Sequence, residues 1–240
     1  MNILIVNDDG FDRPGIVFLK KLLKKYGTVY MCAPKYPQSG KSAAFTYLDG
    51  LSVEKIDEYN YIVDGTPVDC ASFALNVLND IKFDLVISGC NNGHNISYDC
   101  FYSGTIGACK EALVHDIPAI AFSTDVGHFE IVEKEFDDVF KYILDNNLIS
   151  KDYFLNVNFP IKKYASSLGI RFTKQYIRKD TFYFEMKNGK YYPDRYEDKE
   201  GGDNYSDVYS IRNGLISITP LKMTSFDNNL YLELDKKIKA

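Results

Sequence analysis

Several patterns are scarce or missing in this chain of 240 residues, and each absence excludes a class of protein. Histidine occurs three times at scattered positions, which is too few for a histidine-based zinc site. No apolar run approaches the roughly 20 residues that a membrane-spanning helix needs. Basic residues number 28 against 33 acidic ones, so the formal net charge is −5. This balance argues against a general nucleic-acid-binding protein, and we expect no nucleic-acid partner and no membrane partner.

The five cysteines lack the spacing of a metal site. Their number is odd and no two of them form a C-x-x-C pair, so they predict reduced thiols, as in a cytosolic protein. The first apolar run begins at residue 2, which leaves no room for a signal peptide. We therefore expect a cytoplasmic location. The thiols belong to Cys32, Cys70, Cys90, Cys100 and Cys109.

The N-terminal stretch predicts a buried strand that ends in two adjacent carboxylates. Residues 2–6 form a continuous apolar run, which suits a strand covered on both faces of a parallel sheet. Asp8 and Asp9 follow, and both can line one site only if the backbone turns, as Gly10 permits. Adjacent like charges repel unless a cation lies between them, so a divalent metal ion is expected. The alternative is that Asp8 caps the turn and Asp9 is solvated.

Alternating patterns along the chain predict an α/β fold with a doubly wound, mostly parallel sheet. Helical patterns over 14–26, 67–78, 104–115 and 130–146 alternate with strand patterns over 28–33, 83–88, 118–123 and 153–157. Residues 45–64 alternate apolar and polar side chains, which indicates short antiparallel strands. One α/β domain is therefore expected over residues 1–165.

Beyond Pro160 the pattern changes. Residues 170–219 lack helical periodicity and are rich in Tyr, Phe, Ile and Thr around turn signals at Asn188-Gly189 and Asn213-Gly214. We expect residues 166–240 to form a β-rich extension. Its polar segment 191–205 is expected to be mobile or completed by a partner chain. After residue 222 the sequence does not decide between helix and strand.

Polar residues also follow the second strand and the strand over 83–88. Ser39 lies beside a glycine and a lysine, where its hydroxyl could ligate a metal ion or contact a phosphate. Asn91, Asn92 and Asn95 supply an unusual density of neutral oxygen ligands and amide donors. His94 lies among them and is a weak candidate for an acid or base. The plain alternative for either segment is a polar loop.

A helix begins at Ser103, Gly104 and Thr105. Its start offers free backbone N–H groups, two hydroxyls and the positive end of the helix dipole, which together favour a bound phosphate. An ordinary serine or threonine cap is the alternative. All candidate ligands in the chain are oxygens, which suit Mg²⁺ or Mn²⁺ better than zinc or copper. The assembled pattern predicts a site for a metal ion and a phosphate.

The same residues carry a resemblance to a known family. The chain closely resembles the stationary-phase survival protein SurE family of metal-dependent 5'-nucleotidases, over residues 1 to about 221. The matching stretches occur in the expected order: Asn7-Asp8-Asp9-Gly10 with Pro14-Gly15, Ser39-Gly40, Gly65-Thr66-Pro67 with Asp69-Cys70, Ser88-Gly89 with Asn91, Gly93 and Asn95, Tyr102-Ser103-Gly104-Thr105, Asn156-Val157-Asn158 with Pro160, and Gly214 with Ile216-Ser217-Ile218-Thr219-Pro220-Leu221.

The resemblance implies roles for individual residues. One divalent ion per subunit, Mg²⁺ or Mn²⁺, would be held by four ligands: Asp8, Asp9, Ser39 and Asn91. The phosphate would contact Asn95, Ser103, Gly104 and Thr105. Asp8 and Asp9 are thus the candidate catalytic residues, either through the metal ion or as base or nucleophile. Ala112, where the family usually has glycine, is a departure that we expect to affect helix packing.

The resemblance further implies a Rossmann-like catalytic domain and a C-terminal β-hairpin extension exchanged in a homodimer or homotetramer. The implied activity is hydrolysis of nucleoside 5'-monophosphates to nucleoside and phosphate, with 3'-monophosphates and polyphosphate as further substrates to test. A receiver-like phosphoacceptor signalling domain is the alternative, with Asp64 as acceptor. Two other classes lack their signatures: a haloacid-dehalogenase-type phosphatase needs D-x-D, and a dinucleotide-binding domain needs G-x-G-x-x-G.

Overall fold

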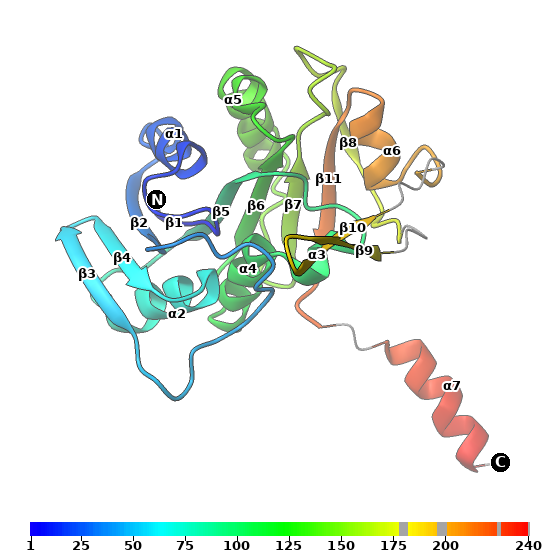
Figure 1. Cartoon of the computed structure of the whole chain (residues 1–240), viewed down its shortest axis with the longest axis horizontal. Coiled ribbons are helices and arrows are strands. Elements are labelled where there is room, and N and C mark those ends of the chain that lie inside the picture. Colours follow the sequence, from blue (N-terminus) through cyan, green and yellow to red (C-terminus); the bar gives the residue numbers. More distant parts are fainter. Residues whose placement is uncertain (178–181, 196–200, 225–226, 240) are drawn as a thin grey trace.

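A mostly parallel sheet forms the centre of the molecule (Figure 1). The computed structural model describes residues 1–177, 182–195, 201–224 and 227–239. Within them the sheet contains β1 (Asn2–Val6), β2 (Thr28–Pro34), β3 (Ser52–Asp57), β4 (Asn60–Asp64), β5 (Leu85–Asn92), β6 (Ala119–Thr124), β7 (Phe154–Asn158), β8 (Ile170–Phe172) and β11 (Ile216–Leu221). Their order is β3-β4-β2-β1-β5-β6-β7-β11-β8. Antiparallel pairing joins β3 to β4 and β7 to β11, while the other neighbours are parallel.

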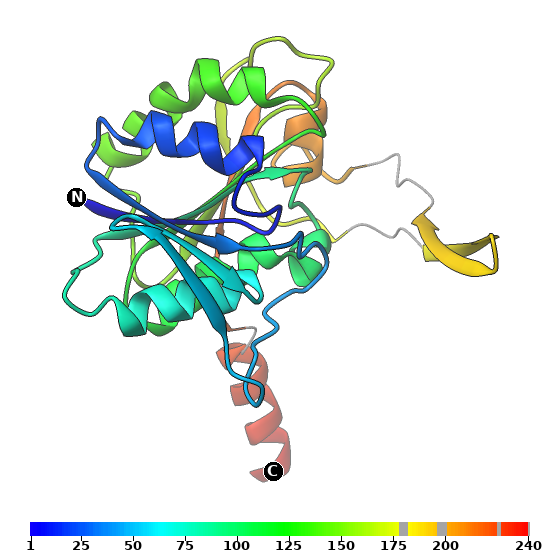
Figure 2. The ribbon, with the colours of Figure 1, turned by 60° about the vertical axis from the view of Figure 1, so that its left-hand side comes forward.

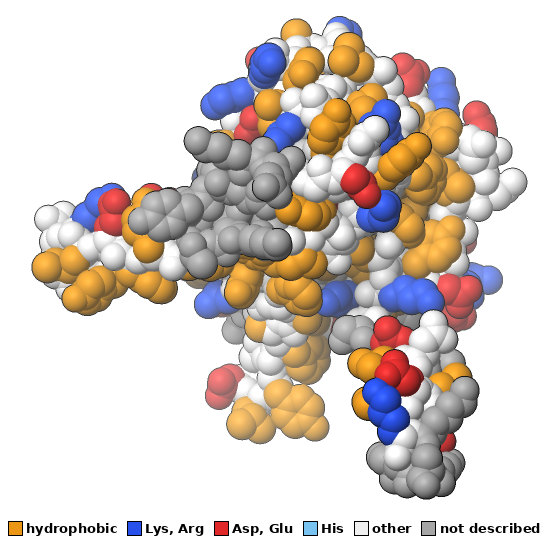
Figure 3. Space-filling view, turned by 90° about the vertical axis from the view of Figure 1, so that its right-hand side faces the viewer, with side chains coloured by type: hydrophobic (Ala, Val, Ile, Leu, Met, Phe, Trp, Pro, Cys, Tyr) orange, Lys and Arg blue, Asp and Glu red, His pale blue; other side chains and the backbone are white. Residues whose placement is uncertain are grey.

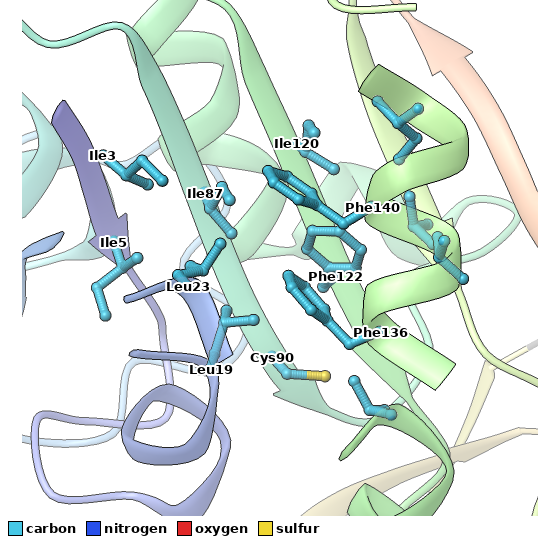
Figure 4. Packing of buried hydrophobic residues seen from close by; sticks show 14 of the residues in the cluster. Ile3, Ile5, Leu19, Leu23, Ile87, Cys90, Ile120, Phe122, Phe136 and Phe140 are labelled. Atoms are coloured by element: carbon cyan, nitrogen blue, oxygen red, sulfur yellow. The ribbon is translucent and has the colours of Figure 1, made fainter. Parts of the chain in front are cut away.

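Helices cover both faces of the sheet, as a doubly wound fold requires (Figures 1 and 2). α1 (Pro14–Leu23) and α5 (Phe129–Asp145) pack on one face, and α2 (Pro67–Val77) and α4 (Gly104–Val114) pack on the other. The α1 and α5 side of the core is shown in Figure 4, where Leu19 and Leu23 of α1 meet Ile5 and Ile87 of the sheet. The α/β fold predicted from the alternating patterns is confirmed.

Local sequence signals explain where the helices begin. Pro14 occupies the first turn of α1, where a missing N–H costs nothing. Thr66 caps α2, since its hydroxyl accepts from the N–H of Asp69 and the Asp69 carboxylate accepts from the N–H of Thr66. Ser103 caps α4 by accepting from the N–H of Ile106 at 3.2 Å. The structure therefore shows at Ser103 the ordinary helix cap that was the alternative to a phosphate site, and Thr66 caps α2 in the same way.

Two local expectations need correction, and the structure decides one segment that the sequence left open. The strand predicted to end at Ser88 continues as β5 to Asn92, with an irregular register against β6 between Ser88 and Asn91. The segment expected to lack helices contains α6 (Asp207–Arg212), which is too short to show a period in the sequence. The undecided terminus forms α7 (Asn228–Lys239). A short helix, α3 (Asp99–Tyr102), also precedes α4.

The strands of the predicted β-rich extension, residues 166–240, belong to two different sheets. β8 and β11 extend the central sheet, whereas β9 (Phe182–Lys187) and β10 (Lys190–Arg195) form a separate hairpin about the predicted turn at Asn188-Gly189. Figure 2 shows this hairpin projecting from the body, and α7 also extends away from it. Of the predicted polar segment 191–205, residues 196–200 lie outside the described part of the chain.

Candidate active site

The two adjacent carboxylates lie in a tight turn at the end of β1. The Asn7 side chain closes this turn, because its amide donates to the carbonyl of Gly10 at 2.8 Å and its oxygen accepts from the Gly10 N–H at 3.3 Å. Gly10 has φ +123°, a left-handed value that a side chain would disfavour. The turn therefore places Asp8 and Asp9 beyond the carboxyl end of a central strand, where open α/β sheets bind ligands.

Asp8 is buried against the beginning of α4. The hydroxyl of Thr105 donates to Asp8 Oδ1 at 2.8 Å. Burial raises the pKa of Asp8 to about 6, and the neighbouring Asp9 charge adds to this rise, while the Thr105 hydroxyl opposes it. Among the described residues, no lysine, arginine or histidine forms an ion pair with Asp8. A buried carboxylate with one charged neighbour of its own sign is an environment that favours a bound cation.

Asp9 is half-buried on the neighbouring side of the turn. Its Oδ2 accepts from the backbone N–H of Asn92, which ends β5, at 3.2 Å. Burial raises the pKa of Asp9, and the Asn92 N–H and the charge of Arg13 oppose this rise. A pocket of about 330 Å³ adjoins Asp9 and is lined by Asp9, Arg13, Pro14, Gly15, Pro37, Asn92 and Phe129. Asp9 is thus the more accessible of the two carboxylates.

The beginning of α4 fits closely against Asp8. A Cβ atom on Gly104 would lie 2.8 Å from Pro67 Cγ and 3.1 Å from Asp8 Cβ. Glycine therefore allows the first turn of α4 to approach the acidic turn. Ser103 and Thr105 flank this glycine and are both buried. The predicted juxtaposition of the acidic turn with this helix start is present in the structure.

Ser39 lies in the loop after β2, one residue from a direct contact with the acidic turn. The N–H of Gln38 donates to the carbonyl of Asp8 at 2.8 Å. The same loop is tied to α3, because Ser42 donates its hydroxyl to Phe101 O at 2.6 Å and its N–H to Tyr102 O at 2.9 Å. Ser39 itself is exposed. The loop thus brings Ser39 to the carboxyl end of the parallel strands, where Asp8 and Asp9 lie.

Asn91 and Asn95 lie at the end of β5 and in the following loop. The Asn91 side-chain amide donates to Gly93 O at 2.8 Å, and its Oδ1 accepts no hydrogen bond from the described residues. Asn95 is buried and donates its side-chain amide to Ser123 Oγ at 3.0 Å. No hydrogen bond joins Ser39, Asn91 or Asn95 to either carboxylate within the described part of the chain.

Sequence reasoning missed the partners that fix these loops from a distance. Asn156 and Asn158 of β7 both donate to Asn95 O. Asp69 accepts from the N–H and hydroxyl of Thr46, at 2.8 and 2.7 Å, in addition to the N–H of Thr66 in the capping box of α2. The Asn-Val-Asn stretch and Asp69 were part of the family resemblance, which was the available signal. Pattern analysis alone assigned them no role because their partners lie far away in the sequence.

The histidines do not form a metal centre. His94 is partly buried, its Nε2 lies 2.8 Å from Phe159 O, and burial lowers its pKa. His115 ends α4 beside Glu111, and His128 is buried before α5. No group of three or more His, Cys, Asp or Glu side chains suited to a metal ion occurs among the described residues. A metal ion at the acidic turn would therefore need hydroxyl or amide ligands beside the two carboxylates.

Asp64, the acceptor in the receiver-like alternative, is exposed at the end of β4, which β2 separates from β1. Within the part of the chain that the structure describes, no helix has both the length and the apolar character to cross a membrane.

Comparison with known proteins gives consistent matches over almost the whole chain. The family described as "Survival protein SurE" matches residues 3–181. Proteins named "5'-nucleotidase SurE" from Aquifex aeolicus and Petrotoga mobilis are 36% and 35% identical to this chain. The alignments cover 92% and 95% of this chain, and 91% and 96% of those proteins.

The fold agrees with a solved member of the same group. The crystal structure of the SurE protein from Aquifex aeolicus superposes with a TM-score of 0.86 and 34% identity, and all of both chains is covered. This fold match and the family match over residues 3–181 both support the same family. The chain belongs to the SurE survival protein family.

Proposed function

We propose that this protein is a metal-dependent 5'-nucleotidase, which hydrolyses nucleoside 5'-monophosphates to nucleoside and phosphate. The observation that carries the proposal is the close approach of the buried Asp8 carboxylate to the start of α4, where Thr105 donates to it. The two adjacent carboxylates and a helix N-terminus thus lie side by side, which supports a joint site for a cation and a phosphate. The relatives named "5'-nucleotidase SurE" support this activity. The receiver-like alternative has no comparable support at Asp64.

The residues at the acidic turn fit a hard divalent cation. Asp8 and Asp9 supply carboxylates. Ser39 follows β2 and Asn91 lies at the end of β5, the two strands that flank β1. All four side chains offer oxygen donors, as Mg²⁺ and Mn²⁺ prefer. The raised pKa of Asp8 reflects a buried charge for which no cationic side chain compensates within the described residues. We propose that these four side chains hold one ion per subunit, which supplies charge neutralisation and Lewis-acid activation when bound.

The protein groups around this position can bind and orient a phosphate monoester. The N–H groups at the start of α4 would donate to phosphoryl oxygens, and the Ser103 hydroxyl, whose oxygen accepts from the Ile106 N–H, could donate its hydrogen to them as well. Asn95 offers a second amide hydrogen beside the one that Ser123 accepts. These donors would stabilise the negative charge that develops on the phosphoryl oxygens as water attacks phosphorus in line. Asp8 or Asp9 as nucleophile is the alternative, which borohydride trapping of an aspartyl-phosphate would reveal.

Phosphate release from a substrate panel tests this proposal. The panel contains nucleoside 5'-monophosphates, 3'-monophosphates and polyphosphate, with Mg²⁺ or Mn²⁺ added to chelator-treated protein. We expect release from the 5'-monophosphates that Asp9→Asn abolishes. Asp12→Asn is a matched control, because Asp12 is exposed in the same turn and pairs with Arg13 at 3.6 Å. Equal release by Asp9→Asn and wild type would contradict the proposal.

We also propose that residues 166–240 mediate self-association into a homodimer or homotetramer of a cytoplasmic enzyme. The projecting hairpin carries exposed apolar side chains, which Figure 3 shows gathered along it. They include Phe184, Met186 and Tyr191, which are 63%, 64% and 71% exposed. Apolar surface of this kind favours a protein contact. Light scattering after size-exclusion chromatography tests the proposal, with F184S/Y191S expected to shift the species toward the monomer.

A further inference from the structure

A pair of buried asparagines on β7 holds the backbone of Asn95. Asn156 donates to Asn95 O at 2.7 Å, and Asn158 donates to the same oxygen at 3.0 Å. The N–H of Asn95 in turn donates to Asn158 Oδ1 at 2.9 Å. Asn158 also donates to Asn156 Oδ1 at 3.2 Å, so the pair is internally connected. Both side chains are fully buried.

The chemistry of this contact requires asparagine. Asn158 accepts from the N–H of Asn95 and donates to both Asn95 O and Asn156 Oδ1, and at this size only a side-chain amide offers an acceptor together with two hydrogens to donate. Leaving a buried donor or acceptor without a partner is costly, so the arrangement fixes the Asn95 backbone strongly. The side chain of Asn95 is fixed separately by Ser123 Oγ on β6.

The residues after Asn95 are anchored from the opposite side. Ile96 packs with Val208 and Ile211 of α6, and the N–H of Ser97 donates to Asp207 Oδ2 at 2.8 Å. The loop is therefore held between β7 and α6. Within it, the Asn95 side chain keeps one amide hydrogen free, and its Oδ1 accepts no hydrogen bond from the described residues.

We propose that Asn156 and Asn158 are positioning residues for phosphate recognition, which act through Asn95. This inference rests on the proposed function, in which Asn95 contacts the phosphoryl group. Loss of the clamp would let the Asn95 backbone move, so its amide would no longer be aligned with a phosphate oxygen. Outer partners that orient metal ligands change affinity or activity by about 10- to 100-fold when mutated, and we expect the lower end of that range for partners that orient a phosphate ligand.

A double-mutant cycle separates positioning from a general structural role. The variants are Asn158→Ala, Asn95→Ala and the double variant, and the readout is the Kd of inorganic phosphate measured by calorimetry with Mg²⁺ present. We expect Asn158→Ala to weaken phosphate binding about tenfold in the wild-type background and less than about threefold when Asn95 is already alanine. Equal factors in both backgrounds, or an unchanged Kd in Asn158→Ala, would overturn the inference.

Two further variants control for folding. Asn60→Ala removes another buried asparagine that hydrogen-bonds Asp57, at the opposite end of the parallel strands, and is expected to leave the Kd unchanged. Asn156→Ala removes a single hydrogen bond to Asn95 O and should weaken binding less than Asn158→Ala, so it serves if Asn158→Ala does not fold. Should wild type bind phosphate but release none from any nucleotide, the proposed function would fail while the cycle would still decide the role of the asparagine pair.

Discussion

Thr105 donates its hydroxyl hydrogen to Asp8 Oδ1 over 2.8 Å, although 97 positions separate the two residues in the sequence. The bond joins the acidic turn after β1 to the first turn of α4. It orients the carboxylate of Asp8. Removal of this one hydroxyl therefore tests whether the two parts of the site act together.

Thr105→Val is expected to lower both activity and stability. The substitution keeps the side-chain shape and leaves Asp8 Oδ1 without its hydroxyl donor, which costs about 1 to 3 kcal/mol when such a group is buried. Urea denaturation and kcat/KM for a nucleoside 5'-monophosphate measure the two effects. Thr105→Ser retains the hydroxyl and should recover most of the activity. A fully active Thr105→Val enzyme would contradict a role for this bond.

Gly104→Ala is expected to reduce activity at least tenfold, or about 1.4 kcal/mol in transition-state stabilisation. The added Cβ would meet Pro67 Cγ at 2.8 Å and Asp8 Cβ at 3.1 Å, so α4 must move away from the acidic turn. Steady-state kinetics test this expectation. Ala108→Gly is the control, because it changes the same helix without adding an atom. Wild-type kinetics in Gly104→Ala would show that the close approach is dispensable.

The metal-free protein should lose stability as pH rises through about 6. The folded-state pKa of Asp8 is raised from 3.8 to about 6, so the stability linked to its protonation is fully present below 3.8 and is lost above 6. The difference amounts to about 3 kcal/mol. Urea denaturation with chelator at pH 4 and pH 7 measures it, relative to Asp8→Asn, which lacks the titrating group. Parallel pH profiles of wild type and Asp8→Asn would contradict the shift.

Asp69→Ala is expected to destabilise the protein by about 3 kcal/mol, because it removes the carboxylate half of the α2 capping box and leaves donors of Thr46 and Thr66 unpaired. Thermal denaturation measures the change. Asp64→Ala is the matched control, since Asp64 is an exposed carboxylate at the end of β4. The control should be neutral for stability and for activity, and loss of activity in it would instead favour a phosphoacceptor at Asp64.

The parts of the fold that depend on short-range patterns could be predicted. The apolar run of β1 and the spacing of Ile16, Leu19 and Leu23 in α1 each identify an element from neighbouring residues. The end of β5 could not be predicted, because its glycine and asparagine residues are typical of a loop. The helix α6 was not predicted, because six residues are too few to establish a helical period.

The candidate site likewise has a part that the sequence predicts and a part that it does not. The sequence alone identifies two groups of candidate residues, because each group is contiguous in the chain. Asp8 and Asp9 follow the strand β1, and Ser103 to Thr105 begin the helix α4. The contacts that organise them are long-range: Asn158 reaches Asn95 across 63 positions, and Asp207 reaches Ser97 across 110. Such pairs have no periodic signal in a single sequence. Their discovery required the structure.

The central claim is that Asp8 and Asp9 hold a divalent ion on which nucleotide hydrolysis depends. Phosphate release from a nucleoside 5'-monophosphate should therefore be measured as Mn²⁺ is titrated into chelator-treated wild type and Asp8→Asn. The account predicts that release by wild type rises from the background to saturation with the ion, while Asp8→Asn stays near the background. Release by wild type that is independent of added metal, or equal titration curves for the two proteins, would contradict it.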